Sequence, residues 1–264
     1  MPEPPLSPAA ATVRRHDPDR FLTALFAPAV HREPLFLLYA FNHELARARE
    51  IASQPTLALI RLQWWREVVE GAVRRHELAT PLGEALAAGR LDRGELLTMI
   101  AGREVEADES VPTRAEWRLF IHSSAGALAA AAARALGGDG AVVERVRALG
   151  AAYGVAGQLR SIGLLARYGR CQLPEDVLAE HGLTTHAVLA TPDAPAVRSV
   201  RDVLAADGQS WIDAGRGRFP AGEVAAALPG VLARRDLARL DAPLRPRGVG
   251  DRLAVITAAM RRRV

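Results

Sequence analysis

The sequence lacks lysine altogether, so all 34 of its basic residues are arginines, set against 30 acidic residues. This bias, together with abundant alanine, arginine and glycine, is typical of a GC-rich coding sequence rather than of a binding surface. The formal net charge is only +4, and the high isoelectric point follows from the very high pKa of arginine. The charge balance therefore gives no support for binding to nucleic acid.

Cysteine is nearly absent as well, because Cys171 is the single one in 264 residues. One cysteine excludes an internal disulfide framework and a zinc site built on several cysteines, and it suits a reducing compartment. No segment reaches the roughly 18–20 apolar residues needed to cross a bilayer. The most apolar run, residues 125–136, is short and contains Arg134. We therefore expect a soluble, cytoplasmic protein.

Sequence signatures of common catalytic sites are also missing. The chain contains no GxxxxGK[ST] phosphate loop, no GxGxxG segment after a strand, no HExxH pair and no GxSxG elbow. Runs of alternating β-branched residues, which would predict strands, are missing too. These absences exclude the common nucleotide-binding, zinc-protease and serine-hydrolase sites.

Helical periodicity covers most of the chain. Leu35, Leu38, Phe41, Leu45 and Ala48 recur at spacings of three and four, which places them on one face of a helix. Breaks that contain Gly, Pro or Asp separate further helical segments, at about 17–28, 54–75, 92–109, 113–136, 141–168, 195–214, 222–239 and 249–262. The predicted fold is all-α, with one domain over 17–264 and a disordered lead-in over 1–16.

Five segments, in order, resemble the squalene/phytoene synthase family between about Asp17 and Leu240. They are LFLLYAFNHELARARE, LIRLQWWREVVEG, ELLTMIAGREVEAD, FIHSSAGALAAAAARALG and GAAYGVAGQLRSIGLLARYGRCQLPEDVLAEHGL. The last is the most specific, because the layout from Gly150 to Pro174 matches that of the family without a gap. The resemblance implies an isoprenoid-synthase-like helical bundle around a central cavity.

In active members of this family, two aspartate-rich helices face each other across the cavity. Their carboxylates hold Mg²⁺ ions, which bind the diphosphate groups of two prenyl substrates. The chemistry explains the pattern, because hard oxygen ligands suit Mg²⁺ and carboxylates four residues apart share a helix face. The metal ions also stabilise the departing diphosphate.

This sequence departs from the family pattern at both motifs. The first acids of the family fall on Ala46, Arg47 and Glu50, of which only Glu50 is acidic. The second acids fall on Ser161 and Leu165. A leucine cannot bind a metal ion, and an arginine repels one. The resemblance therefore predicts no metal site, no catalytic residue and no cofactor.

The altered motifs resemble a branch of the family that includes the mitochondrial complex I assembly factor. This resemblance implies a non-catalytic protein that binds subunits or assembly intermediates of respiratory complex I. The alternatives are a divergent transferase for prenyl diphosphates, which alone would use Mg²⁺, and an isoprenoid or lipid carrier. Arginines bind phosphate oxygens through paired hydrogen bonds. The candidate residues of a ligand-binding cavity are thus Glu50, Arg47, Arg61, Arg160 (the arginine kept from the second motif), Ser161, Arg167 and Arg170.

Basic clusters stand near both ends of the chain, VRRH at 13–16 and RRRV at 261–264. An arginine near an anionic membrane surface contributes about 1 kcal/mol of attraction. The clusters therefore predict at most a peripheral contact with the inner face of the cytoplasmic membrane. The alternative is that they only serve solubility.

Overall fold

Short polar residues and glycine mark helix ends in the computed structural model, as capping chemistry predicts. The side chains of Ser7, Asp92, Thr113 and Asp139 each accept a hydrogen bond from a backbone N–H in the helix that follows. Gly71 ends another helix with a left-handed φ of 118°. The helix predicted over 54–75 therefore stops earlier than expected, because the chain turns at this glycine.

The structure describes residues 6–50, 54–107, 110–242 and 246–264. Its elements are α1 (Pro8–His16), α2 (Pro18–Ala24), α3 (Ala29–Glu50), α4 (Pro55–Glu70), α5 (Ala79–Ala87), α6 (Arg93–Glu104), η1 (Val105–Ala107), α7 (Arg114–Ile121), η2 (His122–Gly126), α8 (Ala127–Ala135), α9 (Gly140–Arg160), α10 (Ile162–Arg167), α11 (Glu175–Glu180), α12 (Thr185–Ala190), α13 (Pro195–Gly215), α14 (Val224–Ala227), α15 (Pro229–Leu237) and α16 (Val249–Arg261).

Within those ranges the structure contains helices and two isolated bridges but no β-strand, which confirms the predicted all-α, single-domain class. Three predicted helices are interrupted. The segment 113–136 contains a π-helical turn, 141–168 breaks at Ser161, and 222–239 breaks at Leu228. The last break precedes Pro229, which has no N–H to continue a helix. In the described part of the chain, no helix is both long and apolar enough to cross a bilayer.

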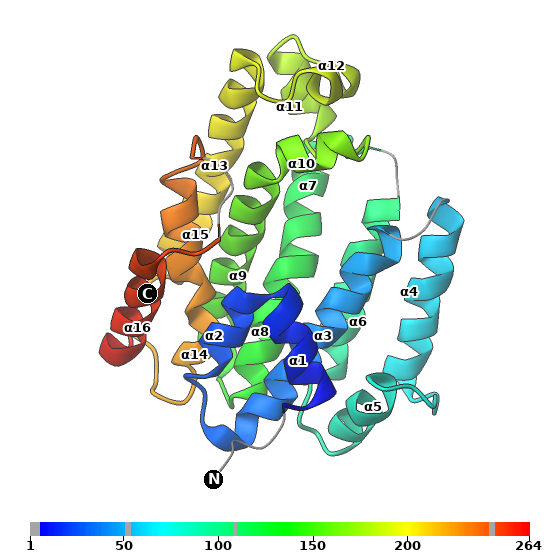
Figure 1. The fold of residues 1–264 in the computed structure, drawn as a ribbon, viewed down its shortest axis with the longest axis vertical. Helices are drawn as coiled ribbons and strands as arrows, with labels where there is room; N and C mark the ends of the chain where they lie inside the picture. The colour runs from blue at the N-terminus through cyan, green and yellow to red at the C-terminus, as the bar shows by residue number, and fades with distance from the viewer. Residues whose placement is uncertain (1–5, 51–53, 108–109, 243–245) are drawn as a thin grey trace.

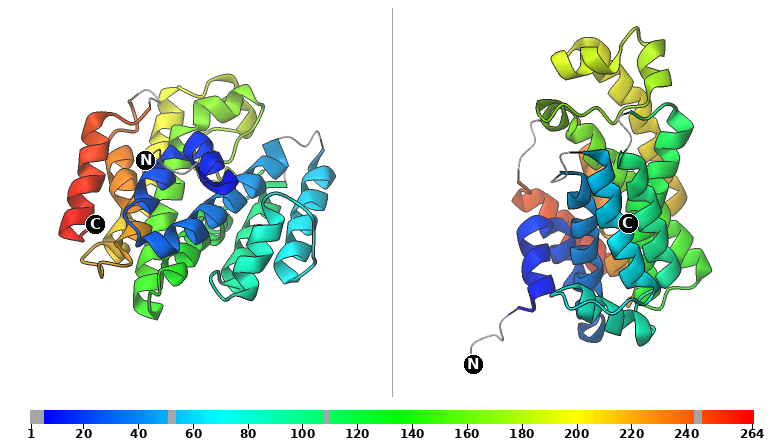
Figure 2. Two further views of the ribbon diagram at one scale, coloured as in Figure 1. Left: turned by 60° about the horizontal axis from the view of Figure 1, so that its bottom comes forward. Right: turned by 90° about the vertical axis from the view of Figure 1, so that its right-hand side faces the viewer.

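The long helix α9 lies in the middle of the bundle, and α8, α13 and α15 pack against it (Figure 1). Helices α3 and α6 contact α8, and α4 packs on α3 and α6. Figure 2 shows α11 and α12 projecting at one end of the molecule. The ends of α3 and α9, where the two altered motifs lie, are thus held by a continuous layer of packed helices.

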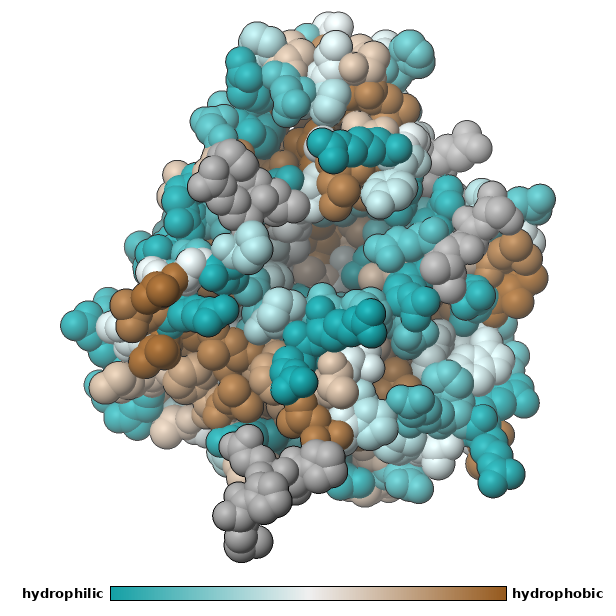
Figure 3. Space-filling view, in the orientation of Figure 1, coloured by the Kyte–Doolittle hydropathy of each residue, from teal (hydrophilic) through white to brown (hydrophobic). Residues whose placement is uncertain are grey.

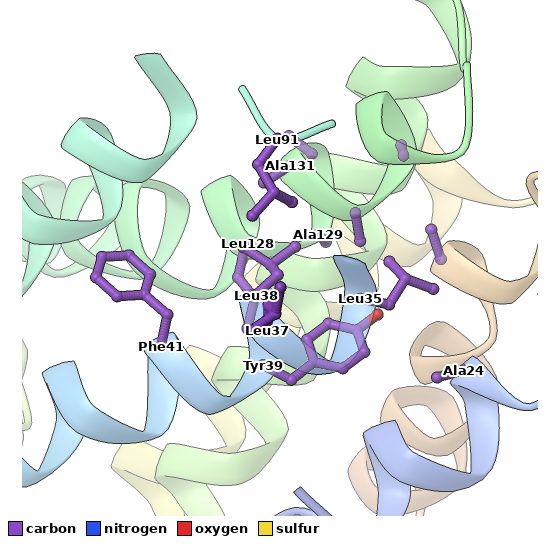
Figure 4. Packing of buried hydrophobic residues seen from close by; sticks show 14 of the residues in the cluster. Ala24, Leu35, Leu37, Leu38, Tyr39, Phe41, Leu91, Leu128, Ala129 and Ala131 are labelled. Atoms are coloured by element: carbon purple, nitrogen blue, oxygen red, sulfur yellow. The ribbon is translucent and has the colours of Figure 1, made fainter. Parts of the chain in front are cut away.

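Helix α3 is buried along the face that its sequence pattern predicts and, over Pro34–Phe41, on its other sides as well. Figure 4 shows Leu37 and Leu38 beside Leu128 of α8, with Tyr39 on the side of Ala24 in α2. The five residues of the predicted face are each at most 2 % exposed, namely Leu35, Leu38, Phe41, Leu45 and Ala48. Burial of each large apolar side chain contributes about 1.5–3 kcal/mol, so this face anchors α3.

Small residues let α9 approach η2 and α8 closely. A Cβ atom added at Gly150 would lie 2.2 Å from the Cβ of Ala129, and one at Gly154 would lie 2.6 Å from the Cβ of Ala125. Real side chains do not tolerate such contacts, so both positions require glycine at this helix crossing. The alanine-rich segment is therefore a packing surface for the helix that carries the second motif.

The predicted disorder over 1–16 is wrong for most of that segment. Residues 8–16 form α1, and Ala9, Ala10 and Val13 are buried as α1 packs on α3. Residues 1–5 lie outside the described residues. The short apolar face of α1 gives little periodicity in the sequence, and α3 supplies the surface that stabilises it.

Candidate functional site

The first altered motif lies at the end of α3. Glu50 is the last residue of the helix and is exposed, while Ala46 and Arg47 are half-buried one turn earlier. Nη1 of Arg47 lies 3.3 Å from Oε1 of Glu44 on the same helix. Such partly exposed pairs contribute little to stability, so Arg47 has a weak partner on its own helix.

The second altered motif lies where α9 ends and α10 begins. Arg160 is the last residue of α9, and Ser161 forms a turn before α10. The N–H of Ser161 donates to the carbonyls of Gly157 and Gln158 at 3.1 and 3.0 Å. This backbone N–H therefore keeps hydrogen-bond partners where the helix is interrupted. Leu165 follows one turn later and is half-buried.

These residues do not fit the Mg²⁺ ions that the family resemblance implies for active members. Of the positions compared in the two motifs, only Glu50 offers a carboxylate, whereas Mg²⁺ favours several oxygen ligands in octahedral geometry. Among the described residues, no group of three or more His, Cys, Asp or Glu side chains is placed to hold a metal ion. Neither motif helix supplies the chemistry of that site.

Arg160 is instead held by a buried carboxylate. Its Nη1 lies 2.8 Å from Oδ2 of Asp236 on α15. The two terminal nitrogens of Arg247 donate to the same carboxylate at 2.5 and 2.8 Å. Because Asp236 is only 4 % exposed, two arginines neutralise its charge inside the protein.

Arg247 connects this pair to the N-terminal helices. Its Nε donates to the carboxylate oxygens of Asp19 at 2.9 and 3.1 Å, and the hydroxyl of Tyr153 donates to Asp19 at 2.7 Å. Burial opposes the charge on Arg247, but hydrogen bonds to Asp236 and Asp19 outweigh it and raise its pKa. We call this set the Asp236 network; it consists of Asp19, Tyr153, Arg160, Asp236 and Arg247.

A third arginine, Arg20 of α2, borders the Asp236 network. Arg20 forms an ion pair of 2.7 Å with Asp17, and its guanidinium carbon lies 4.9 Å from the ring centre of Tyr153 and 5.9 Å from that of Tyr39. Burial raises the pKa of both tyrosines. The tyrosines therefore stay neutral and stack with a charged arginine, which is a favourable cation–π arrangement.

A cavity of about 310 Å³, the first cavity, lies between the end of α3, η1 and the segment that follows α10. Figure 3 shows this face of the molecule hollowed near its middle. Arg49, Phe120, Arg170 and Cys171 are among the residues that line the cavity. Burial raises the pKa of the Cys171 thiol, which keeps it protonated and unreactive at neutral pH. Its place in the wall agrees with a packing role.

Several charges act on Arg170 at the first cavity. Burial lowers the pKa of Arg170, and the positive charges of Arg49 and Arg103 act in the same direction. The carboxylates of Glu106 and Glu50 oppose the shift. The end of α3 and the segment after α10 are thus close enough for their charges to interact.

A chain of polar side chains supports the wall of the first cavity. Trp117 Nε1 donates to Gln158 Oε1, Gln158 Nε2 to Gln172 Oε1, and Gln172 Nε2 to Glu106 Oε1, each at 3.0 Å. Nη1 of Arg103 completes the chain at 2.8 Å from the other oxygen of Glu106. These hydrogen bonds connect α6, η1, α7, α9 and the loop before α11, so the wall has a defined geometry.

A second cavity of about 970 Å³ lies between α10, α13 and residues 240–242. Arg160, Arg167 and Arg198 line it together with Asp193 and Asp241. Its wall therefore carries both positive and negative side chains, unlike a site dedicated to a single anion.

The structure divides the seven candidate residues rather than gathering them in one site. Arg170 lines the first cavity with the charge of Glu50 nearby, and Arg160 and Arg167 line the second. Arg47, Arg61 and Ser161 line neither cavity, and Arg61 is exposed on α4.

Sequence reasoning missed most of the Asp236 network. In the sequence Asp17 and Asp19 fit the start of α2, where Asp17 indeed caps the helix. No local pattern pairs Asp236 with Arg247, or Arg247 with Asp19, because these contacts join different elements. Only Arg160 was identified, through the family resemblance.

Comparisons with known proteins agree with this architecture. A family model described as squalene/phytoene synthase matches residues 13–256. Complex I assembly factor 6 of Bos taurus is 26 % identical over 198 residues, and that of Homo sapiens is 25 % identical over the same length. Each match covers 73 % of this chain but 59 % of the relative, so the chain spans less than two thirds of these proteins.

A bifunctional lycopene cyclase/phytoene synthase of Phaeosphaeria nodorum is 24 % identical over 288 residues, covering 98 % of this chain and 49 % of the relative. Among solved structures, a dehydrosqualene synthase superposes with a TM-score of 0.78 at 13 % identity, covering 96 % of this chain and 94 % of the other. The squalene synthase HpnC from Alicyclobacillus acidocaldarius has a TM-score of 0.73 at 20 % identity, covering 89 % and 94 %. These likenesses confirm the predicted isoprenoid-synthase-like fold.

Proposed function

Because this chain belongs to the squalene/phytoene synthase family but has lost most of the acids of both motifs, we propose that it is a non-catalytic member. We propose that it acts by binding, and that it assists the assembly of respiratory complex I. Its partners are subunits or assembly intermediates of that complex.

The observation that carries this proposal is the composition of the two motif helices. Ala46, Arg47, Ser161 and Leu165 stand where the family resemblance places acids, and Glu50 is exposed. Without the metal ions, the charge of a departing diphosphate has no Lewis acid to stabilise it. The loss of that stabilisation raises the barrier to condensation by several kcal/mol, which lowers the rate by orders of magnitude.

The choice of partner rests on the relatives. The bovine and human proteins are named as complex I assembly factors, and each match covers 73 % of this chain. The packed core and the buried Asp236 network supply a rigid scaffold for binding. We place the protein in the cytoplasm, with a peripheral contact at the inner face of the cytoplasmic membrane.

The first cavity also supports the binding of a small ligand. It has apolar walls at Phe120 and Val111 and a half-buried arginine, Arg170. Such a site suits an isoprenoid or lipid with an acidic head group, held without turnover. A ligand of this kind would add to the binding function rather than replace it.

Deletion of the gene tests the assembly proposal. We expect membranes of the deletion strain to lose NADH:quinone oxidoreductase activity and complex I subunits, and the wild-type gene to restore both. Glu50→Gln, which removes the remaining acid of the first motif, should restore them equally because no metal binds there. Unchanged complex I together with altered isoprenoid products would favour the transferase instead.

A turnover assay tests the loss of catalysis directly. Purified protein incubated with farnesyl or geranylgeranyl diphosphate and Mg²⁺ should form no squalene or phytoene, while an active squalene synthase under the same conditions does. Product formation at an ordinary enzymatic rate, on the order of 1 per second, would refute the non-catalytic assignment.

A further inference from the structure

The outward face of α16 carries apolar side chains that the core of the protein does not use. Val249, Leu253, Ile256 and Met260 follow one another at spacings of four, three and four, and they are 73, 55, 36 and 79 % exposed. With 3.6 residues per turn, this spacing places all four on one narrow strip of the helix. Figure 3 shows apolar residues gathered at the left of the view, where α16 lies in Figure 1. We call these four residues the α16 stripe.

The opposite face of α16 already faces the core. Asp251, Val255, Ala258 and Ala259 are buried, and α16 packs on α15 through this side. The stripe is therefore a second apolar face and not the edge of the first. Contiguous apolar surface of this kind marks a site of interaction with another surface.

A further apolar feature lies beside α2. A groove of about 360 Å³ lies between α2, α15 and α16, and Phe21, Leu22, Leu25 and Leu232 supply most of its apolar wall. From α16 it is lined by Asp251 and Arg252 and by none of the stripe residues. Leu25 is 41 % exposed at its edge. The groove is therefore a separate feature, and the stripe alone supplies the outward apolar face of α16.

Exposed positive charge accompanies the stripe on α16. Arg252, Arg261 and Arg263 are exposed on α16 and directly after it. The single acid in the α16 sequence, Asp251, points inward, where Arg235 and Arg239 each donate to its Oδ1 at 2.7 Å. The outward side of α16 thus combines apolar side chains with arginines and presents no carboxylate of its own.

We propose that the α16 stripe docks on an anionic phospholipid surface. The apolar side chains enter the boundary between head groups and acyl chains, and the flanking arginines bind lipid phosphates. A protein partner would also cover apolar residues, but the one-sided arginine charge matches an anionic lipid surface better. This inference rests on the peripheral membrane contact proposed above and assigns it a surface. It does not depend on complex I as the partner.

Vesicle cosedimentation of the purified full chain tests the proposal. We expect binding to vesicles made of equal amounts of phosphatidylglycerol and phosphatidylcholine. Binding to vesicles of phosphatidylcholine alone should be at least about tenfold weaker, because the arginines lose their electrostatic partner. High salt should weaken binding to the anionic vesicles for the same reason.

Two sets of variants separate the apolar and charged contributions. The triple variant Leu253→Gln/Ile256→Gln/Met260→Gln should weaken binding to anionic vesicles at least about tenfold. The variant Arg252→Gln/Arg261→Gln should weaken it about fivefold for each arginine. All five side chains are exposed, so circular dichroism should show unchanged helix content in both variants.

A matched control carries the same chemical change elsewhere on the surface. Ile60, Val73 and Leu119 are 60, 96 and 65 % exposed and lie outside α2 and α16. The variant Ile60→Gln/Val73→Gln/Leu119→Gln should bind anionic vesicles like the wild type. An equal loss in this control would overturn the proposal, because binding would then depend on general surface apolarity.

Two further outcomes would also overturn it. One is the absence of wild-type binding to anionic vesicles. The other is a stripe variant that keeps vesicle binding but loses its association with complex I subunits, which would make the α16 stripe a protein-docking surface. The vesicle assay uses the purified chain alone. A negative result would therefore contradict the membrane proposal without contradicting the assembly proposal, which the deletion experiment tests separately.

Discussion

Arg247 in the Asp236 network and Arg170 at the first cavity are both partly buried and both lie among several charged groups. Burial opposes the positive charge at each position, yet the pKa of Arg247 is raised and that of Arg170 is lowered. The difference lies in their partners. Arg247 donates hydrogen bonds to two carboxylates, Asp19 and Asp236, whereas Arg170 forms no ion pair with any described residue.

This contrast separates structural arginines from those available to a ligand. In the Asp236 network, carboxylates within hydrogen-bond distance balance the arginines, and one of these, Arg160, is the arginine kept from the second motif. At the first cavity, Arg49 and Arg103 add to the positive charge around Arg170. The acids of the Asp236 network thus stabilise the interior, while the motif positions where the family resemblance places acids hold only Glu50.

The largest expected effect comes from removing the central carboxylate. Asp236→Ala leaves Arg160 without its buried partner and Arg247 with Asp19 alone, so the free energy of unfolding should fall by about 3–5 kcal/mol. Urea denaturation measures the change. In the control Asp213→Ala, which removes an exposed partner of Arg216, the loss should stay below about 1 kcal/mol. Similar losses in the two variants would contradict a structural role for the network.

Replacing each arginine by methionine compares the two regions directly. Arg247→Met should lower the free energy of unfolding by about 2–4 kcal/mol, because Asp19 and Asp236 lose their shared partner. Arg170→Met should change it by less than about 1 kcal/mol, because no ion pair is broken and a charge unfavoured by burial is removed. Thermal and urea unfolding of both variants provide the test. A larger loss for Arg170→Met would reverse the assignment of the two regions.

The smallest effect concerns pH and a carboxylate on α16. Burial alone would raise the pKa of Asp251, but hydrogen bonds from Arg235 and Arg239 outweigh it and lower the pKa from 3.8 to about 2. Because the folded-state pKa lies below the unfolded one, this stabilisation is present above pH 3.8 and is lost as the pH falls towards 2.

The variant Asp251→Asn measures that contribution. At neutral pH the wild type should be more stable than the variant by about 2 kcal/mol, and the gap should close between about pH 4 and pH 2. Asp202→Asn, at an exposed position of α13, should differ from the wild type by less than about 0.5 kcal/mol at either pH. If the wild type were still more stable than Asp251→Asn at pH 2, the residue would act through packing rather than charge.

The helical class and the buried face of α3 could be predicted because both depend on short-range spacing. Leu35, Leu38 and Phe41 repeat with the period of a helix, and that repeat requires no knowledge of other elements. Two features were harder to predict, namely that α4 ends at Gly71 and that residues 8–16 are ordered as α1. In the first case a single glycine overrides good helix formers, and in the second a weak helix is stabilised by α3.

The candidate site was predicted only in part, for a related reason. The loss of acids at Ala46, Arg47, Ser161 and Leu165 is readable from the aligned pattern alone. In a chain whose basic residues are all arginine, residue type cannot tell which arginine is paired. The sequence offered Arg160 and Arg170 alike as residues of a ligand-binding cavity, and the structure pairs Arg160 with a buried carboxylate.

The sequence by itself determined the all-α class, the family resemblance and the absence of the metal-binding acids, since each follows from residue type and local spacing. Only the tertiary structure decided that Asp19, Arg160, Asp236 and Arg247 meet in one buried network, and that Val249 and its neighbours along α16 face outward. Ion pairing and exposure depend on which distant elements pack together, and local spacing carries no information about that packing. The sequence therefore gives the charge of each arginine. Its role depends on whether the fold places it beside a carboxylate or at an exposed surface.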